Sequence, residues 1–526
     1  MLGSAAARAE QRETAAQGAK EEAKTGAAKT GAAKTGAAKT ADAAKTAPEP
    51  AAPPVETQHR VRIGGTDVAY TATTGMLTLE DDAGKPKANV FFIAYTRDDV
   101  DDRSQRPLTF SFNGGPGSSS VWLHLGVLGP RRVFMPDDPT QAAPPGRLVE
   151  NASSVLDVTD LVFVDPVSTG YSRPAEGEGA KQFHGVREDV QSVGDFIRLY
   201  LTRSQRWTSP KFLIGESYGT TRAAGLSDYL QDRHGVYLSG VVLVSSILNF
   251  QTARFDEGND LPYVLFLPTY TATAWYHKKL APELQADLKK TLDEARRFAL
   301  GEYAEALLNG NQLSEADRQD LAQKVARLTG LSPTFVERVN LRVAISRFTK
   351  ELLREQRLTV GRLDSRYTGR DEDAAGDRTE YDPSMMAITG PYTAAFNAYV
   401  RRDLKYENDD VYEILTGKVQ PWKPQEPGRY TNVAPALRSA MARNPHLRVL
   451  VANGYYDLAT PFFATEYTFN HLAYDGDYRE RVRLTYYEAG HMMYIHGPSL
   501  DQLKQDLATF ITAAASAPEV MTSGGK

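Results

Sequence analysis

One pentapeptide in the sequence has the residue types and the order of a serine nucleophile. Gly-Glu-Ser-Tyr-Gly at residues 215–219 places Ser217 after an apolar stretch at 211–214 and before a helical pattern at 220–231. A tight turn from strand to helix needs small flanking residues, and the N-terminus of the following helix favours negative charge on the serine and its substrate. The pentapeptide alone is a weak signal, so its partners must decide whether Ser217 does chemistry.

A serine hydroxyl becomes a good nucleophile only when a base removes its proton. Among the nine histidines, His491 lies in a glycine-flanked loop directly after a late apolar stretch. His496 follows shortly afterwards and is the fallback. We therefore expect His491 to be the base.

The base in turn needs a carboxylate that orients it. Asp457 follows an earlier predicted strand, so the chain order is serine, aspartate, histidine, as expected when each residue follows a strand of one parallel sheet. Asp475 and Asp477 are nearer to His491 in sequence, but they flank a glycine ahead of its strand, which is typical of a turn. Asp457 is the predicted third member.

Acyl transfer also needs N–H donors for the tetrahedral oxyanion. The turn at Ser217 supplies the backbone N–H of Tyr218, and a second donor should come from an early loop after a strand. Asn-Gly-Gly-Pro-Gly at residues 113–117 follows the apolar stretch 108–112. Glycine lets the backbone approach a substrate closely and proline stiffens the turn, so we predict that this loop completes an oxyanion hole.

The elements that must position these residues alternate between strands and helices. Short β patterns occupy residues 59–96. Nearly continuous apolar stretches follow, each ending in a glycine-rich or polar loop, at 108–112, 161–164, 211–214, 240–244, 448–451 and 482–487. Buried strands that alternate with helical segments predict an α/β fold whose mostly parallel sheet is covered on both faces and is preceded by a β-rich lead-in.

A helical block interrupts the strand series and defines the predicted domains. Residues 250–392 carry amphipathic helical patterns, with N-cap signals at Ser314 and Ser332. The strand series resumes afterwards. We interpret the block as a helical cap inserted into one catalytic domain made of residues 59–249 and 393–516.

The two ends of the chain differ in composition from the rest. Residues 1–58 are rich in alanine, contain no aromatic side chain and repeat Lys-Thr-Gly-Ala-Ala. Without large apolar groups such a segment cannot offset its ordering entropy, so we predict a disordered tail. Residues 517–526 are predicted to be a flexible C-terminus.

Composition also excludes several classes of protein. The chain has no cysteine, which excludes disulfides and thiolate metal sites. A net charge of −5 provides no basic field for nucleic acid. The uncharged stretch 107–130 contains Asn, Gly, Pro and Ser in its middle, so we expect no membrane span. No motif for a metal or another cofactor occurs, and none is expected.

Taken together, these blocks resemble the serine carboxypeptidase family of the α/β-hydrolase clan. The matching segments are Phe-Asn-Gly-Gly-Pro-Gly-Ser-Ser-Ser at 112–120, Gly-Glu-Ser-Tyr-Gly at 215–219, Asn-Gly-Tyr-Tyr-Asp at 453–457, Ala-Gly-His-Met at 489–492 and a further loop at 165–172. The similarity runs from about residue 61 to the last predicted helix. The cysteine-free core and the β-rich lead-in resemble the bacterial branch of the family.

The resemblance implies an α/β-hydrolase fold and an enzyme that removes C-terminal residues from peptides. Ser217 would form the acyl-enzyme, with Asp457 and His491 completing the catalytic triad. Backbone N–H groups of Gly115 and Tyr218 would hold the oxyanion.

The resemblance further implies that Asn113 and Glu216, with help from Gly114, bind the C-terminal carboxylate of the substrate. Two carboxyl groups in contact cannot both be ionised cheaply, so one proton must be shared and peptides should bind more tightly at acidic pH. Many members carry a Glu fourteen residues after the Asn, where this chain has Val127. Carboxylate recognition should therefore rest more heavily on Asn113 and Glu216.

Two other classes of function remain open. An esterase, amidase or acyltransferase could use the same triad, because a fold does not fix the reaction. A non-catalytic binding protein is the second alternative, and the presence of every catalytic part argues against it. The expected partners are peptide or protein C-termini. No apolar segment typical of a signal peptide is visible, and the resemblance favours a periplasmic or secreted location.

Overall fold

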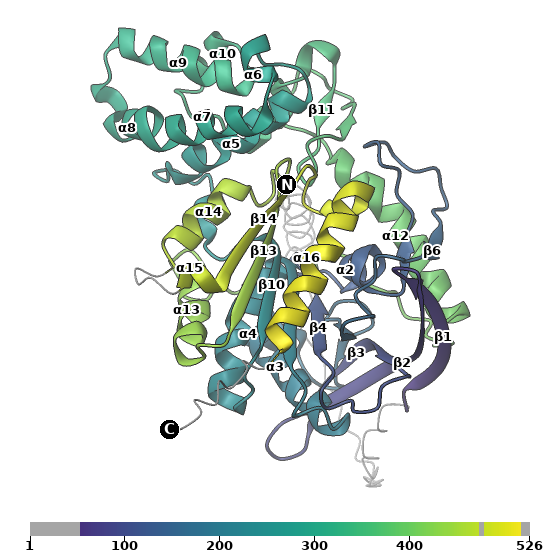
Figure 1. Ribbon diagram of the computed structural model, residues 1–526. Coiled ribbons are helices and arrows are strands. Elements are labelled where there is room, and N and C mark those ends of the chain that lie inside the picture. The colour runs from purple at the N-terminus through teal and green to yellow at the C-terminus, as the bar shows by residue number, and fades with distance from the viewer. Residues whose placement is uncertain (1–52, 473–477, 517–526) are drawn as a thin grey trace, which may run out of the picture. The chain divides into compact units, whose positions relative to one another are not determined.

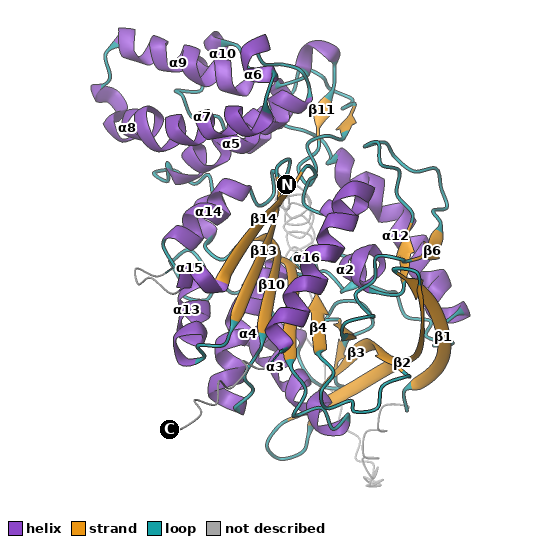
Figure 2. Cartoon of the chain, in the orientation of Figure 1, coloured by secondary structure: helices purple, strands orange, loops and turns teal. Residues whose placement is uncertain are grey.

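The fold is known from a computed structural model that describes residues 53–472 and 478–516. The predicted tail as far as residue 52, residues 517–526 and the rejected candidates Asp475 and Asp477 lie outside the described residues. The described chain contains a 10-stranded sheet with the order β1-β2-β3-β7-β4-β9-β10-β13-β14, to which β8 adds beside β3 (Figures 1 and 2). Its strands are β1 (Val55–Ile63), β2 (Thr66–Glu80), β3 (Pro86–Arg97), β4 (Leu108–Phe112), β7 (Asp160–Val164), β8 (Arg173–Pro174), β9 (Lys211–Ser217), β10 (Gly240–Ser246), β13 (Arg448–Gly454) and β14 (Val482–Tyr487).

The sheet has a parallel part and an antiparallel part. Strands β7, β4, β9, β10, β13 and β14 pair in parallel. Strands β1, β2 and β3 form an antiparallel lead-in that joins the rest where β3 pairs with β7. Strands β4, β7 and β10 are short and wholly buried because helices cover both of their faces. The predicted mostly parallel α/β fold with a β-rich lead-in is confirmed.

Alternate residues of one strand enter different cores. In β10, Val242 and Val244 pack with side chains of α12 (Pro383–Arg402) and α16 (Gly497–Ala515), whereas Val241 and Leu243 pack on the other face of the sheet. The helices of that second face are α3 (Val186–Arg203), α4 (Tyr218–His234) and α13 (Ala434–Arg443). Shorter elements near the sheet are α2 (Val121–Leu123), the π-helix η1 (His124–Leu128), β5 (Arg131–Val133), β6 (Leu148–Glu150), η2 (Ala180–Phe183), α14 (Phe462–Asn470), α15 (Tyr478–Arg481) and η7 (Met493–Ile495).

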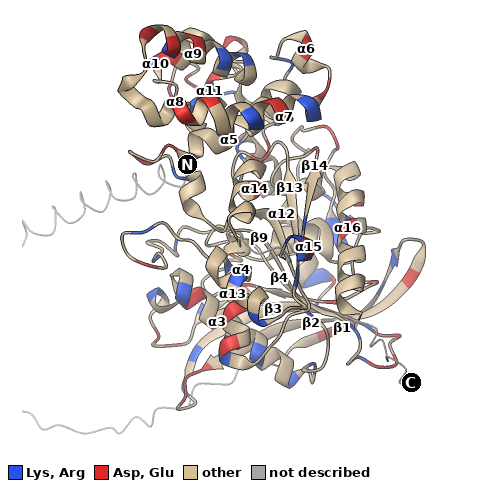
Figure 3. Cartoon of the chain, turned by 60° about the vertical axis from the view of Figure 1, so that its left-hand side comes forward, with Lys and Arg blue, Asp and Glu red and all other residues tan. Residues whose placement is uncertain are grey.

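A helical cap with its own core lies between β10 and α12 in sequence. Its elements are η3 (Phe250–Ala253), α5 (Leu261–Tyr276), α6 (Pro282–Gln285), α7 (Leu288–Phe298), η4 (Ala299–Tyr303), α8 (Ala304–Asn309), η5 (Gly310–Gln312), α9 (Glu315–Thr329), α10 (Pro333–Arg338), α11 (Ile345–Glu351), η6 (Arg354–Gln356), β11 (Thr359–Val360) and β12 (Thr368–Gly369). The cap core includes Tyr455, Tyr456 and Phe462, so the cap packs on the segment that follows the carboxyl end of β13 (Figure 1). Acidic and basic residues are interspersed along the cap helices (Figure 3). The side chains of Ser314 and Ser332 accept hydrogen bonds from the third residue of their helices, as predicted.

Two predicted domain boundaries are wrong. The tail was expected to extend to residue 58, but β1 begins at Val55, where an alternation of half-buried and exposed residues already starts. The cap was expected to end at residue 392, which lies in the middle of α12. The side chains of Ile388 and Phe396 pack in the sheet core and not in the cap core. Helical periodicity identifies a buried face without indicating which core buries it.

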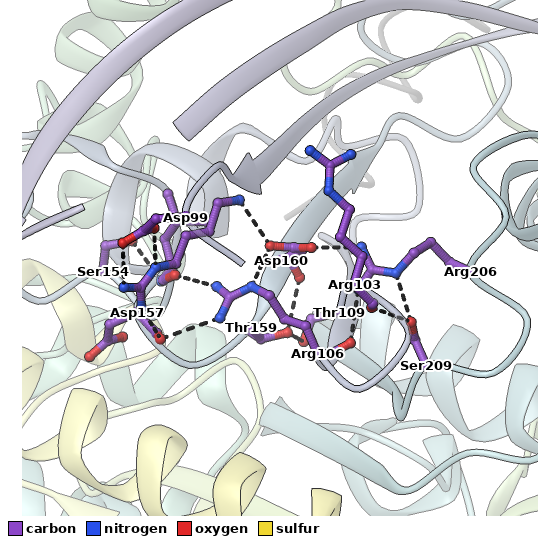
Figure 4. A network of polar contacts seen from close by, with 12 residues as sticks. Asp99, Arg103, Arg106, Thr109, Ser154, Asp157, Thr159, Asp160, Arg206 and Ser209 are labelled. Carbon is purple, nitrogen blue, oxygen red and sulfur yellow. Dashed lines mark hydrogen bonds and ion pairs between the residues drawn. The ribbon is translucent and has the colours of Figure 1, made fainter. Parts of the chain in front are cut away.

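The amino end of the parallel strands is held by an amino-end cluster that consists of Arg106, Asp160 and Arg206 (Figure 4). All three side chains are buried. Asp160, the first residue of β7, accepts hydrogen bonds from Nε of Arg106 and from Nη1 of Arg206, both at 2.6 Å. Other N–H groups of the two guanidiniums are also paired. Arg106 donates to the carbonyl of Leu156, and Arg206 donates to the carbonyl of Arg106 and to the hydroxyl of Ser209. The cluster thus satisfies its charges within the protein.

Candidate active site

Ser217 occupies the turn between β9 and α4. Its backbone has φ 59° and ψ −128°, a conformation that costs free energy in a residue with a side chain. A Cβ on Gly215 would lie 2.1 Å from the carbonyl oxygen of Gly219, so the turn can close only with glycine at that position. Within residues 215–219, Ser217 alone is partly exposed. The turn therefore presents one hydroxyl to solvent from an otherwise buried segment.

Asp457 and His491, which are far apart in sequence, are in direct contact. Nδ1 of His491 lies 2.7 Å from Oδ2 of Asp457, and both side chains are buried. The backbone N–H groups of Ala459 and Thr460 and the hydroxyl of Thr460 donate to the same carboxylate. Burial alone would lower the pKa of His491, but the Asp457 carboxylate raises it above its usual range. Because Nδ1 is engaged, Nε2 is the ring atom left to take up a proton.

Strand pairing brings the serine and histidine segments together at the carboxyl end of the sheet. Ser246 of β10 pairs in register with Ser217. The neighbouring hydroxyl of Ser245 donates to the carbonyl of His491 at 2.6 Å. After Asp457, the charge of Glu216, the residue before the serine, also helps to raise the pKa of His491. The three predicted triad residues thus lie around one point of the sheet edge.

The predicted oxyanion loop lies against the serine turn. A Cβ on Gly114 would come within 2.4 Å of the backbone nitrogen of Tyr218 and 2.8 Å of Cβ of Ser217, so a glycine is required for this approach. Gly115 has φ +106° and is exposed. Tyr218 is the first residue of α4, where a backbone N–H has no partner within the helix.

Glu216 and Asn113 form a buried polar pair beside the serine. Oε2 of Glu216 accepts a hydrogen bond from the Tyr494 hydroxyl at 2.5 Å. Burial raises the pKa of Glu216 to about 7, although His491, Tyr494 and the amide of Asn113 oppose this. Oδ1 of Asn113 accepts from the backbone N–H of Leu123, whereas its Nδ2 makes no hydrogen bond of good geometry among the described residues. An unpaired donor next to a carboxyl group is suited to a carboxylate ligand.

Two residues that contact this site were not found by sequence reasoning. Arg222 is fully buried on α4, donates from Nε to Asp189 at 2.8 Å and from Nη1 to the carbonyl of Asn113 at 2.7 Å. Tyr494 reaches Glu216 from the segment after His491. Both sit at positions that a sequence pattern marks only as part of a helix or loop, so no local signal identifies them.

The fallback histidine, His496, has other partners than the triad carboxylate. His496 contacts the hydroxyl of Ser499 at 2.8 Å and does not contact Asp457. It lines a hollow of about 450 Å³ together with Trp275, Tyr276, Lys278, Arg366, Tyr456 and Glu488, and no triad side chain lines that hollow. Val127 is buried in η1.

Residues 53–472 and 478–516 contain neither a cluster of metal-ligating side chains nor a membrane-spanning helix. No group of three or more His, Asp or Glu side chains there could hold a metal ion. No helix in the same part of the chain is both long enough and apolar enough to cross a membrane.

Comparison with known proteins assigns the chain to a family. The family model described as serine carboxypeptidase matches residues 64–501. The chain belongs to the serine carboxypeptidase family. The matched range contains the serine turn, the Asp457–His491 pair and the loop at 113–117, so the site described above lies wholly within the serine carboxypeptidase domain.

Individual serine carboxypeptidase relatives are distant. The pheromone-processing carboxypeptidase KEX1 of Saccharomyces cerevisiae is 31% identical over 145 residues, which cover 26% of this chain and 19% of that protein. The serine carboxypeptidase-like protein 34 of Arabidopsis thaliana is 24% identical over 254 residues, which cover 46% of each protein. The chain thus spans less than half of the length of these relatives. A prohormone-processing carboxypeptidase structure from Saccharomyces cerevisiae aligns with a TM-score of 0.51 and 16% identity over 84% of this chain and 91% of that chain. This likeness establishes the shared α/β-hydrolase fold.

Proposed function

We propose that this protein is a serine carboxypeptidase that removes C-terminal residues from peptides. The observation that carries the proposal is the position of a buried carboxyl group, Glu216, and an unpaired amide, Asn113 Nδ2, directly beside the serine turn. A general hydrolase has no need of a buried, protonatable carboxyl group at that point. A peptide C-terminus supplies the carboxylate that can pair with both groups.

The proposed reaction begins with the Asp457–His491 pair. Nε2 of His491 takes the hydroxyl proton of Ser217 as Oγ attacks the last peptide carbonyl, and Asp457 stabilises the imidazolium. Backbone N–H groups of Gly115 and Tyr218 receive the oxyanion. His491 then gives its proton to the leaving amine, which releases the C-terminal amino acid. Water next attacks the acyl carbon while His491 takes its proton, and His491 returns this proton to Oγ of Ser217 as the shortened peptide acid leaves.

Substrate selection is proposed to depend on the C-terminal carboxylate. Asn113 Nδ2 and the backbone N–H of Gly114 would donate to it. Because burial raises the pKa of Glu216 to about 7, its carboxyl group is protonated in acidic solution and can donate its proton to the substrate carboxylate. This arrangement favours cleavage of the last peptide bond over internal bonds.

A pair of blocked dipeptides tests the proposal against the esterase, amidase and acyltransferase alternatives. An N-blocked dipeptide with a free C-terminus should lose its last residue, whereas its C-amide should resist cleavage. Equal cleavage of both would indicate a general hydrolase. Mass analysis of a digested peptide mixture would show whether residues leave only from C-termini.

Active-site labelling tests the alternative of a non-catalytic binding protein. A fluorophosphonate should label the wild-type protein at Ser217, and Ser217→Ala should abolish the labelling while leaving the unfolding transition unchanged. A wild-type protein that resists labelling would favour a binding protein.

We also propose a bacterial lineage and a periplasmic or secreted location. The cysteine-free sequence and the antiparallel lead-in β1–β3 support the lineage, and the family resemblance supports the location. A family tree that groups the chain with the yeast and plant members would contradict the first point. Cell fractionation that recovers the protein in the cytosol would contradict the second.

A further inference from the structure

Tyr494 holds the carboxyl group of Glu216 from the side of the histidine loop. It lies in η7, the short turn that follows His491, and its side chain is buried. Its hydroxyl donates to Oε2 of Glu216 at 2.5 Å. The amide of Asn113 is a second polar group that acts on this carboxyl group. The phenol thus fixes one carboxyl oxygen, next to an amide nitrogen, Asn113 Nδ2, that makes no other hydrogen bond among the described residues.

The absence of a side chain at Gly126 leaves the space that the Tyr494 ring occupies. A Cβ on Gly126 would lie 2.2 Å from Cε2 of Tyr494, so any larger residue would displace the ring. The next residue is Val127, which stands where many family members carry a second acid. The Tyr494 ring therefore packs against the segment from which that acid is missing, and its hydroxyl gives Glu216 a partner from another loop.

The groups around Glu216 determine how it titrates. Burial dominates and raises the pKa of Glu216 to about 7, His491 and the contacts with Tyr494 and Asn113 lower it, and Asp457 raises it. Burial and the neighbouring Glu216 raise the pKa of Tyr494 well above its usual value, so the phenol stays a neutral donor. Tyr392, a further buried phenol nearby, is also uncharged and makes no hydrogen bond through its hydroxyl in the described part of the chain.

We propose that Tyr494 is a positioning residue for substrate binding: its hydroxyl pins Oε2 of Glu216 so that Oε1 and its proton face the C-terminal carboxylate, and this contact sets the pH above which carboxylate binding weakens. The identity of the ligand rests on the proposed function. A hydrogen bond to an ionised group stabilises the ion, so the loss of the phenol should keep Glu216 protonated to higher pH.

The test measures binding in a Ser217→Ala background, where no turnover occurs. Calorimetry gives the Kd of an N-blocked dipeptide with a free C-terminus, and of its C-amide, between pH 5 and about 9. The variants are Tyr494→Phe, Gly126→Ala, which displaces the ring but keeps the hydroxyl, and Tyr303→Phe as the matched control. Tyr303 is a buried cap tyrosine whose hydroxyl donates at 2.6 Å to the carbonyl of Leu341.

The expected result is a pH midpoint for binding of the free acid near 7 in the parent protein. In Tyr494→Phe this midpoint should rise by about one pH unit or more, and Gly126→Ala should move it in the same direction. Tyr303→Phe should leave it unchanged, and the C-amide should show no such midpoint.

Three outcomes would overturn the inference. They are an unshifted midpoint in Tyr494→Phe, an equal shift in Tyr303→Phe, and binding that is insensitive to the free carboxylate. Peptide turnover by the wild-type protein is a separate measurement. A protein that binds carboxylates with the expected midpoints but does not cleave peptides would contradict the proposed function and still support the role of Tyr494.

Discussion

The two ends of the parallel sheet bury charge in opposite ways. At the amino end, the carboxylate of Asp160 is held between Arg106 and Arg206, and each guanidinium also donates to other protein groups (Figure 4). At the carboxyl end, Glu216 has one hydrogen bond from Tyr494 and lies beside an unpaired amide nitrogen. The amino end is complete without a ligand, whereas the carboxyl end is not.

The difference indicates where a buried charge serves stability and where it serves binding. A buried ion that is fully paired contributes to a unique packing of the elements around it, and its removal costs stability. A buried carboxyl group whose partners are incomplete stays protonated near neutral pH and can share its proton with a ligand. Substitutions at the two ends should therefore separate activity from stability.

The largest effect is expected from Asp457→Asn at the carboxyl end. Asparagine keeps the shape of the side chain but cannot stabilise the imidazolium of His491 or hold its tautomer, so kcat should fall about ten-thousandfold. The midpoint of unfolding in urea should fall less than in Asp160→Asn, because the asparagine oxygen can still accept from the backbone N–H groups of Ala459 and Thr460. Steady-state kinetics with a blocked dipeptide and a denaturant titration measure both quantities. A kcat within tenfold of wild type would exclude Asp457 as the orienting carboxylate.

The converse result is expected from Asp160→Asn at the amino end. The two buried guanidinium groups lose their counter-ion, so the free energy of unfolding should fall by about 3–5 kcal/mol. At a temperature where the variant remains folded, kcat and KM should match those of wild type. A large loss of kcat without a loss of stability would show that the two ends are not separable.

An intermediate effect is expected from Arg222→Met, because Arg222 belongs to a buried ion pair and also contacts the active site. It is paired with Asp189 like a structural ion, but it also donates to the carbonyl of Asn113 in the oxyanion loop. Loss of that donor should loosen the loop and lower kcat/KM about 100-fold. Burial raises the pKa of Asp189, so the carboxyl group left behind can become protonated.

A double variant distinguishes positioning from stability at this residue. Arg222→Met with Asp189→Leu replaces the buried pair by apolar side chains, which should restore the free energy of unfolding. It should not restore kcat/KM, because the carbonyl of Asn113 still lacks its donor. Full recovery of kcat/KM in the double variant would show that Arg222 acts only through stability.

Much of the fold was predictable because the parallel strands are short apolar runs followed by distinctive loops. The predicted strand at 108–112 matches β4, and the segment ending at Ile214 lies within β9. The order of serine, aspartate and histidine predicted the contact between Asp457 and His491, which the structure contains. These features follow from local pattern and from the common edge of a parallel sheet.

The rest depended on tertiary contacts that no local pattern encodes. Tyr494 is a residue of a short turn, and only the packing of its ring over Gly126 brings its hydroxyl to Glu216. Arg222 lies on a helix face whose burial next to Asp189 cannot be read from spacing. The predicted end of the cap was wrong for the same reason. The periodicity of α12 indicates that one face is buried, but not which core buries it.

The smallest expected effect is the pH dependence of substrate binding by the wild-type protein. Burial raises the pKa of Glu216 to about 7, so below that pH the carboxyl group is protonated and can donate to the substrate carboxylate. Above it, two negative charges face each other. KM for a free C-terminus should therefore be constant at acidic pH and rise above pH 7, by about tenfold at pH 8.

A blocked dipeptide ester, which lacks the carboxylate, is the control and should show no such rise in KM. A parallel rise for acid and ester would assign the titration to another group, and the carboxyl end would then resemble the amino end in using its buried carboxyl group only for structure.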